Sequence, residues 1–183
     1  MKEKKYKRAH LRAPLKSQAI CSYDEQVYLG KTLNISEGGL LITDLYNVSG
    51  SNSLYFMVDL PSYPTLSEFG KEEILNLDWN SFERDVLRMN GSIVRSFDYQ
   101  GEKLHGCSFS SISEGGVGVI KNYVKSFSEN IVYLLELFES LGRGDLKLSV
   151  LRKVAFLLGY DPDEKIFLMR KRVLHDYQSL EKL

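Results

Sequence analysis

The spacing of apolar residues changes once along this chain, near residue 116, and that change limits the folds the chain can adopt. Before it, short segments rich in β-branched and aromatic residues alternate with turn residues. After it, apolar residues recur every three or four positions, which predicts amphipathic helices. The pattern therefore predicts a β-rich unit followed by a helical extension.

The part before residue 116 predicts about six strands. Four are expected near residues 18–23, 27–33, 40–43 and 54–60, and a hairpin is expected from 88–99 and 103–110. Short strands with frequent turns are typical of a small antiparallel barrel or sandwich. Between these strands the pattern is interrupted by prolines, and residues 74–79 could be a further strand or part of a long insertion.

Three helices are expected in the second part of the chain. The apolar stripes run over residues 119–141 and 148–158, and Gly159 is placed to end the second helix. The Asp-Pro-Asp-Glu sequence of residues 161–164 predicts the start of a third helix, with the first Asp as its cap and Pro at the first helical position. Apolar residues then continue over 166–180.

Together these patterns predict an α+β protein: a small antiparallel six-stranded β-barrel followed by a helical C-terminal extension. We place the barrel domain, with a basic arm at its N-terminus, at residues 1–125. The helical extension is placed at residues 126–183.

Composition sets the class of protein. With 183 residues, 43% of them hydrophobic, the chain can bury a core without disulfides, and its 24 Lys and Arg balance its 24 Asp and Glu. Cys21 and Cys107 lie far apart, which excludes a Cys-rich zinc module and a disulfide framework. No apolar run of about 18 residues occurs, and no apolar region follows the basic N-terminus, so we expect a cytoplasmic protein without a membrane span.

Two short motifs concentrate the residues that could hold a ligand. The first is R-x-x-x-R, formed by Arg8 and Arg12 within an arm whose first twelve residues contain six Lys or Arg and one Glu. The second is N-x-S-x-x-G, formed by Asn34, Ser36 and Gly39 where one expected strand ends and the next begins. Guanidinium groups bind phosphate oxygens or guanine edges in pairs of hydrogen bonds. Asn and Ser add short donors and acceptors, and glycine can adopt a positive φ and lets the backbone approach a ligand closely.

In order and spacing, the two motifs resemble the signature of PilZ domains, which are bacterial β-barrel receptors for cyclic di-GMP. The resemblance covers about residues 5–125 and includes the strands on either side of the motifs. It implies that Arg8 and Arg12 hold the phosphates of the ligand and contact its guanines. It also implies that the three residues of the second motif line the other side of the site, with Asn34 standing where many members carry Asp.

Two features of the chain depart from the usual pattern of that family. Lys7 precedes the first motif, where some members place a further Arg that is associated with binding one ligand or a stacked pair. The resemblance thus includes Lys7 in the site and leaves the stoichiometry open. Residues 61–87 are longer than the usual strand connection, which predicts an insertion near the barrel.

The resemblance implies a receptor that changes conformation when its arm closes over the ligand and that signals to a protein partner. No cofactor, DNA partner or enzymatic activity is expected, since His10, His105 and His175 are scattered and form no catalytic grouping. The alternative is a ligand-independent protein–protein adaptor with the same barrel. In both cases the C-terminal helices are expected to bind a partner or to self-associate. A small RNA-binding barrel that uses the basic arm is a third hypothesis, without a recognisable aromatic stacking motif.

A second R-x-x-x-R lies at Arg84–Arg88, ahead of residues 111–116, which repeat the Ile-Ser-Glu-Gly-Gly of the first site. Ser111 replaces the Asn, and no basic arm adjoins, so a duplicated half-barrel is not favoured. Arg95 is expected to be a solvated strand arginine, and Trp79 a packing residue of the insertion.

Overall fold

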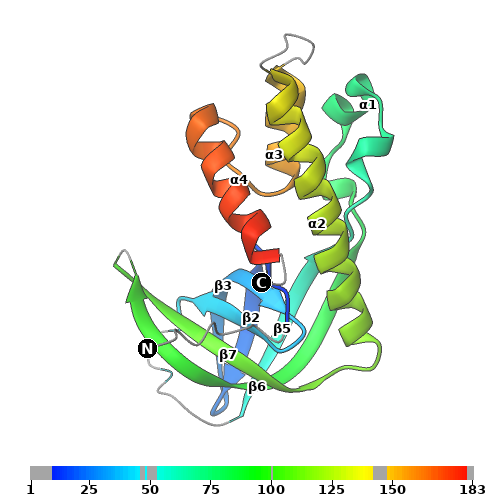
Figure 1. Ribbon diagram of the computed structural model, residues 1–183. Helices are drawn as coiled ribbons and strands as arrows, with labels where there is room; N and C mark the ends of the chain where they lie inside the picture. Colours follow the sequence, from blue (N-terminus) through cyan, green and yellow to red (C-terminus); the bar gives the residue numbers. More distant parts are fainter. Residues whose placement is uncertain (1–9, 46–47, 49–52, 100, 142–147, 181–183) are drawn as a thin grey trace, which may run out of the picture.

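Six antiparallel strands close into a barrel in the computed structural model, which describes residues 10–45, 48, 53–99, 101–141 and 148–180 (Figure 1). The strands of the ring are β2 (Gln18–Tyr23), β3 (Gln26–Ser36), β4 (Gly39–Thr43), β5 (Leu54–Pro61), β6 (Arg84–Tyr99) and β7 (Glu102–Ile112). Their order is β3-β2-β5-β6-β7-β4, and β4 pairs again with β3, which closes the ring. The predicted six-stranded barrel is confirmed.

Alternation of apolar and polar side chains drives the closure. Along β5, every second residue is buried, from Leu54 to Leu60, while the residues between them are half-buried on the outer face. The strands β2 and β3 are joined by Asp24 and Glu25, which both have a positive φ. Two such residues form the tight turn whose twist matches that of the strands it joins.

A short strand, β1 (Ala13–Pro14), leads into β2 along the same edge of β3. The amide of Leu15 donates to the carbonyl oxygen of Leu33 (3.0 Å), and the amide of Thr32 donates to that of Ser17 (2.9 Å). The chain therefore follows β3 from Ala13 onward, which fixes the residues just before it beside the end of β3.

Residues 62–83 form an insertion that contains no strand. It consists of η1 (Leu66–Glu68), α1 (Lys71–Asn76) and η2 (Trp79–Ser81), so the alternative of a strand over residues 74–79 is wrong. Ile74 is fully buried and the turns around it are closed by local hydrogen bonds, which favours helical turns over an extended strand.

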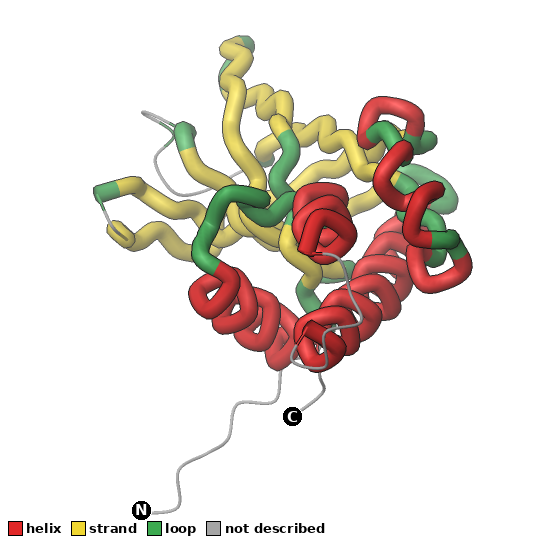
Figure 2. The backbone as a smooth tube through the Cα atoms, turned by 90° about the horizontal axis from the view of Figure 1, so that it is seen from above, coloured by secondary structure: helices red, strands yellow, loops and turns green. Residues whose placement is uncertain are grey.

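Three helices follow the barrel, as predicted: α2 (Gly116–Leu141), α3 (Leu148–Leu157) and α4 (Ile166–Leu180). In Figure 1, α2 runs along one side of the barrel and continues beyond it, where α3 and α4 pack against it. Figure 2 shows the same helices gathered on one side of the strands.

The boundaries of α3 and α4 test two predictions. Gly159, with a φ of +83°, directly follows the last turn of α3, as expected. The predicted start of the last helix at residues 161–164 is wrong, because α4 begins at Ile166. The carboxylate of Asp161 accepts the amide of Asp163 (2.9 Å), so it caps a separate turn ahead of the helix.

One continuous apolar core joins the barrel interior to the helices and the insertion. Among the described helices, none has both the length and the apolar character needed to cross a bilayer. The division of the chain at residues 125/126 stays a prediction.

Candidate ligand-binding site

A hollow of about 270 Å³ lies where β3 ends and β4 begins, and we call it the turn hollow. Its walls are made by His10, Arg12, Asn34, Ser36, Gly38, Gly39, Leu40, Leu41, Val94, Arg95, Gly106, Cys107 and Ser108. The structure thus brings together four of the predicted site residues, Arg12, Asn34, Ser36 and Gly39. The other two, Lys7 and Arg8, lie outside the described residues.

The turn between β3 and β4 is held by hydrogen bonds on both sides. The hydroxyl of Ser36 is buried and donates to the carbonyl oxygen of Gly39 (3.2 Å). The carbonyl oxygen of Gly38 accepts the amide of Phe109 (3.1 Å) and the hydroxyl of Ser108 (3.4 Å) from β7. The second motif therefore forms a turn fastened to the neighbouring strand, which gives the hollow a fixed floor.

Gly39 is required by the strand next to it. A Cβ atom at this position would lie 2.0 Å from the carbonyl oxygen of Cys107 on β7, which is a collision with backbone. Gly39 does not use the positive φ that a glycine can adopt. Its role is to let β4 approach β7 closely.

Arg12 reaches the hollow because β1 is paired with the end of β3. Ala13 lies opposite Ile35, so Arg12 occupies the next position in that register, beside Ser36. Its carbonyl oxygen lies 3.4 Å from the hydroxyl of Ser179 in α4, which makes a shorter hydrogen bond (2.7 Å) to the carbonyl oxygen of Asp176 in the same helix, and Arg12 is half-buried. The first motif is thereby connected to the last helix through the backbone of Arg12.

Asn34 is placed by an irregularity in β3. The pairing with β4 shifts between Thr32 and Asn34, which leaves Leu33 as an extra residue. Such a bulge bends the strand and re-aims the side chains next to it. Asn34 is half-buried and lines the turn hollow.

Arg95 also lines the turn hollow, although sequence reasoning treated it as a solvated strand arginine. The register of β6 with β7 shifts between Ile93 and Arg95, so Val94 is the extra residue of a second bulge. Both Val94 and Arg95 are therefore exposed on the side of the hollow. The sequence feature that could have indicated this is Gly106, a glycine within a strand. A Cβ atom on Gly106 would lie 3.0 Å from the side chain of Arg95, so the glycine leaves room for that side chain to cross β7.

The charge of the turn hollow favours an anion. Arg12 and Arg95 line it, and no Asp or Glu does so among the described residues. Burial, with a smaller contribution from the nearby Cys21, raises the pKa of the Cys107 thiol to about 12, so Cys107 stays neutral. In the described part of the chain, no cluster of His, Cys, Asp or Glu is suited to a metal ion.

No protein-family model and no curated protein matches this sequence. In structure, the chain is similar to the Bacillus subtilis inhibitor of motility MotI/DgrA, with a TM-score of 0.48 and 16% identity over 66% of this chain and 52% of that one. It is also similar to the PilZ domain of YcgR from Escherichia coli, in a structure with c-di-GMP, with a TM-score of 0.41 and 12% identity. That match covers 77% of this chain and 100% of the domain. The chain thus spans about half the length of MotI/DgrA.

Proposed function

We propose that this chain is a cytoplasmic receptor for cyclic di-GMP, which binds in the turn hollow and does no chemistry there. The observation that carries the proposal is that two motifs from separate stretches of sequence meet in one cationic hollow. Arg12 comes from the first motif, and Asn34, Ser36 and Gly39 come from the second. An anion-binding function explains why residues of both motifs line the same hollow.

The chemistry of the hollow suits a ligand with two phosphates and two guanines. Arg12 and Arg95 each present a planar fork of donors for phosphate oxygens or for O6 and N7 of guanine. Each charge-assisted hydrogen bond contributes about 1.5–3 kcal/mol. The side chain of Asn34 supplies both donors and an acceptor for a base edge.

The size of the hollow points to a contribution from the basic arm. Its volume of about 270 Å³ is below the roughly 300–1,000 Å³ of common ligand pockets. We expect it to hold one part of the ligand, with Lys7 and Arg8 of the arm closing over the rest. Binding would then order the arm, a segment-ordering switch.

Contacts on either side of Arg12 give that switch a route to the helices. The hydroxyl of Tyr123 in α2 donates to the carbonyl oxygen of Pro14 (2.6 Å), and the hydroxyl of Ser179 in α4 lies 3.4 Å from the carbonyl oxygen of Arg12. A shift of residues 12–14 on ligand binding would therefore move hydrogen-bond acceptors of two helices. In this way ligand concentration would change the surface offered to a protein partner.

Calorimetric titration of cyclic di-GMP tests the proposal. The wild type should bind the ligand, and the double variant Arg8→Ala/Arg12→Ala should lose binding. The double variant Arg84→Ala/Arg88→Ala, which removes the same charge from the second R-x-x-x-R, should bind as the wild type does. A folded wild type that does not bind, or equal loss in both double variants, would refute the assignment.

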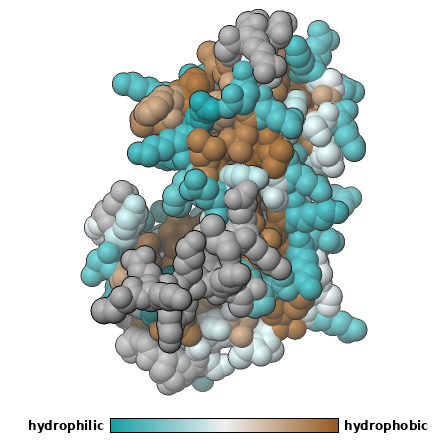
Figure 3. All heavy atoms as spheres, viewed as in Figure 1, coloured by the Kyte–Doolittle hydropathy of each residue, from teal (hydrophilic) through white to brown (hydrophobic). Residues whose placement is uncertain are grey.

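One observation favours the alternative of a ligand-independent adaptor. Large apolar side chains are exposed on α3 and α4, including Phe167 (76% exposed), Phe156 (46%) and Leu168 (44%). On the face seen in Figure 3, hydrophobic residues likewise gather in the helical half, bordered by hydrophilic ones. An adaptor would bind its partner, or a second copy of itself, equally well with and without cyclic di-GMP.

A further inference from the structure

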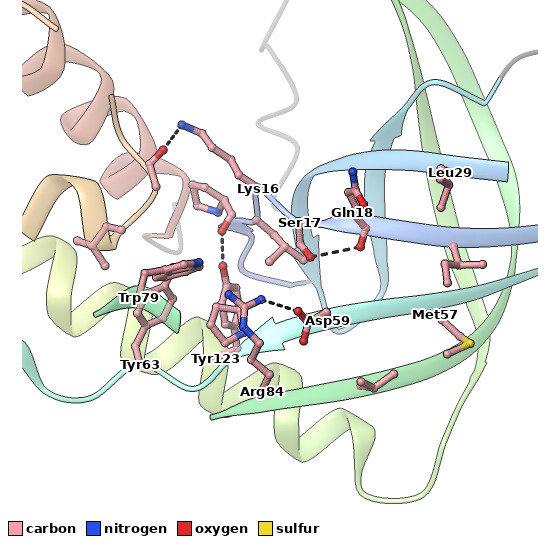
Figure 4. Close-up of a pocket in the computed structure, with 17 residues that line it drawn as sticks. Lys16, Ser17, Gln18, Leu29, Met57, Asp59, Tyr63, Trp79, Arg84 and Tyr123 are labelled. Carbon is pink, nitrogen blue, oxygen red and sulfur yellow. Dashed lines mark hydrogen bonds and ion pairs between the residues drawn. The ribbon is translucent and has the colours of Figure 1, made fainter. Parts of the chain in front are cut away.

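A second and larger hollow, of about 550 Å³, lies at the junction of the barrel and the helices. We call it the junction groove, and it shares no lining residue with the turn hollow. Figure 4 shows Lys16 and Trp79 at one end, Arg84 and Asp59 in the middle, and Leu29 towards the other end. Its volume falls within the range of about 300–1,000 Å³ found for ligand pockets.

One end of the groove is an aliphatic floor on the outer face of the barrel. Ile20 of β2 lies directly opposite Leu29 of β3 on one side and Met57 of β5 on the other. Val86 of β6 lies opposite Asp59, which is the next residue after Met57 on the outer face of β5. Leu29 is 63% exposed, Val86 51% and Ile20 40%, so the strand faces present a connected apolar patch. Contiguous exposed patches of this kind mark binding sites more often than free surface.

Cationic groups stand beside that floor. Arg84 and Lys16 line the groove together with one carboxylate, Asp59. Arg84 donates to Asp59 through Nη1 and lies over the indole of Trp79, 5.2 Å from the ring centre. A guanidinium carries five N–H donors, so this pairing leaves donors for a second acid. The lining keeps an excess of one positive charge, which favours an anionic ligand.

The aromatic end of the groove is already packed. The ring of Trp79 lies 5.7 Å from that of Tyr63 and 5.5 Å from that of Phe82, in addition to its contact with Arg84. Trp79 therefore already packs against three side chains, which leaves less of its ring for a planar ligand. An aliphatic chain on the barrel floor is therefore favoured over an aromatic ring or a nucleobase.

The groove is held open by contacts outside it. Asn130 of α2 is buried, accepts the amide of Leu66 (2.8 Å) and donates to the carbonyl oxygen of Pro64 (2.9 Å). This fastens the insertion that carries Tyr63 and Trp79 onto α2. A cavity formed before the ligand arrives binds it without the cost of ordering its walls.

We propose that the junction groove binds a medium-chain aliphatic carboxylate, the simplest amphipathic organic anion, with its chain on Ile20, Leu29, Met57 and Val86 and its acid at Arg84. The same chemistry could come from a free fatty acid or from the acyl chain of an anionic lipid. Tyr123 of α2 and Leu158 and Gly159 of the turn after α3 line the end of the groove away from the floor, where a lipid headgroup would have to lie, so we commit to the free acid.

Trp79 is the only tryptophan of the chain, so its fluorescence reports directly on the groove. Decanoate, below its micellar concentration, should change the emission of Trp79 in a saturable way. Decanol, which has the same chain without the charge, should bind at least about tenfold more weakly. Saturating cyclic di-GMP should not compete with decanoate for its site, because the two hollows share no lining residue, but the proposed shift of Pro14, which lines the junction groove, can change the affinity for decanoate.

Two variants and one control test the assigned residues. Arg84→Gln should weaken decanoate binding at least about tenfold and leave decanol binding unchanged. Met57→Asp should abolish the binding of both decanoate and decanol, because it places a carboxylate on the apolar floor of the groove. Lys125→Gln, at an exposed position on α2 outside the groove, should match the wild type. Circular dichroism checks that each variant is folded.

The proposal is overturned if decanoate gives no saturable change in the wild type. It is also overturned if folded Arg84→Gln or folded Met57→Asp binds decanoate as the wild type does. A response to phosphatidylglycerol vesicles in the absence of any response to free decanoate would assign the groove to a membrane lipid and contradict the free acid.

Discussion

The turn hollow is made largely of backbone and small side chains, whereas the junction groove is made of large side chains. In the turn hollow, Gly39 sits against a carbonyl oxygen of β7 and Ser36 closes the turn by a hydrogen bond. In the junction groove, Trp79, Arg84 and Met57 form the walls and come from three separate elements. The shape of the turn hollow depends on how closely the strands approach one another, and the shape of the junction groove depends on how the side chains pack. Substitutions should therefore act on the two sites in different ways.

The largest effect is expected at Gly39, where the backbone itself is the obstacle. Gly39→Ala places a Cβ 2.0 Å from the Cys107 carbonyl oxygen, so β4 and β7 must separate. We expect the free energy of unfolding to fall by about 3 kcal/mol. Chemical denaturation measures this.

The matched control for that change is Gly118→Ala on α2. No atom lies within 4 Å of a Cβ placed there, and alanine favours a helix over glycine. The free energy of unfolding of this variant should rise by about 0.5–1 kcal/mol. Equal stabilities of the two alanine variants would show that β4 does not depend on a close approach to β7.

A smaller loss of stability is expected at Asn130, whose side chain holds the insertion. Asn130→Ala leaves the buried amide of Leu66 without its acceptor, which costs about 2 kcal/mol. The change should also loosen the wall that carries Trp79 and shift its emission, while cyclic di-GMP affinity stays within about twofold. Asn122→Ala, at an exposed position on the same helix, is the control. A loss of cyclic di-GMP binding in Asn130→Ala would mean that the two sites are not independent.

Reciprocal substitution of the two arginines separates the sites by ligand. Arg12→Ala should weaken cyclic di-GMP binding at least about tenfold and leave decanoate binding unchanged. Arg84→Gln should do the reverse. Titration of both ligands into both variants completes the test, and a parallel loss of both ligands in either variant would contradict it.

The smallest effect concerns His105 on β7, next to Gly106 in the wall of the turn hollow. Burial lowers the pKa of His105 from its usual 6.5, and Lys103 lowers it further, against a hydrogen bond that the ring donates to the backbone of Leu45, which raises it. His105 therefore binds a proton more readily in the unfolded chain than in the folded chain. The stability from a neutral His105 is complete above pH 6.5 and is lost as the pH falls towards its folded pKa.

Denaturation at several pH values between about 7.5 and 5 measures this loss of stability, because histidine titrates over about this range. His105→Asn, which can keep the hydrogen bond between Ser96 and Nδ1 (2.9 Å), should reduce the slope of stability against pH. His175→Asn, at an exposed position on α4, is the control. An unchanged slope in His105→Asn would remove His105 as its source.

The contrast between the sites also explains what the sequence could predict. The barrel followed from strict alternation in segments such as β5, and the helices followed from apolar stripes. The turn hollow was largely predictable, because Asn34, Ser36 and Gly39 lie within six residues of one another and their turn is local. Arg95 is exposed, as expected, but its place beside the hollow could not be predicted from the alternation, because a bulge at Val94 breaks it and no residue type marks that bulge directly.

The junction groove could not be predicted, because its lining comes from six separate stretches of the chain, at residues 14–20, 29, 57–63, 79–86, 123 and 158–159. Arg84 was seen only as part of an isolated R-x-x-x-R, and Trp79 only as a packing residue. Their contact depends on how the insertion folds back onto β6, which is fixed by Asn130 of α2. Long-range packing of this kind leaves no local pattern.

The most direct test of the account is an amide NMR spectrum of the ¹⁵N-labelled protein recorded with and without cyclic di-GMP. We predict large shifts for the amides of Arg12, Ser36 and Gly106 and a smaller shift for the single indole N–H of Trp79, which reaches Pro14 only through Tyr63 and Tyr123. Shifts at Trp79 without shifts at Ser36 and Gly106 would place the ligand in the junction groove and contradict the assignment of the turn hollow as its site.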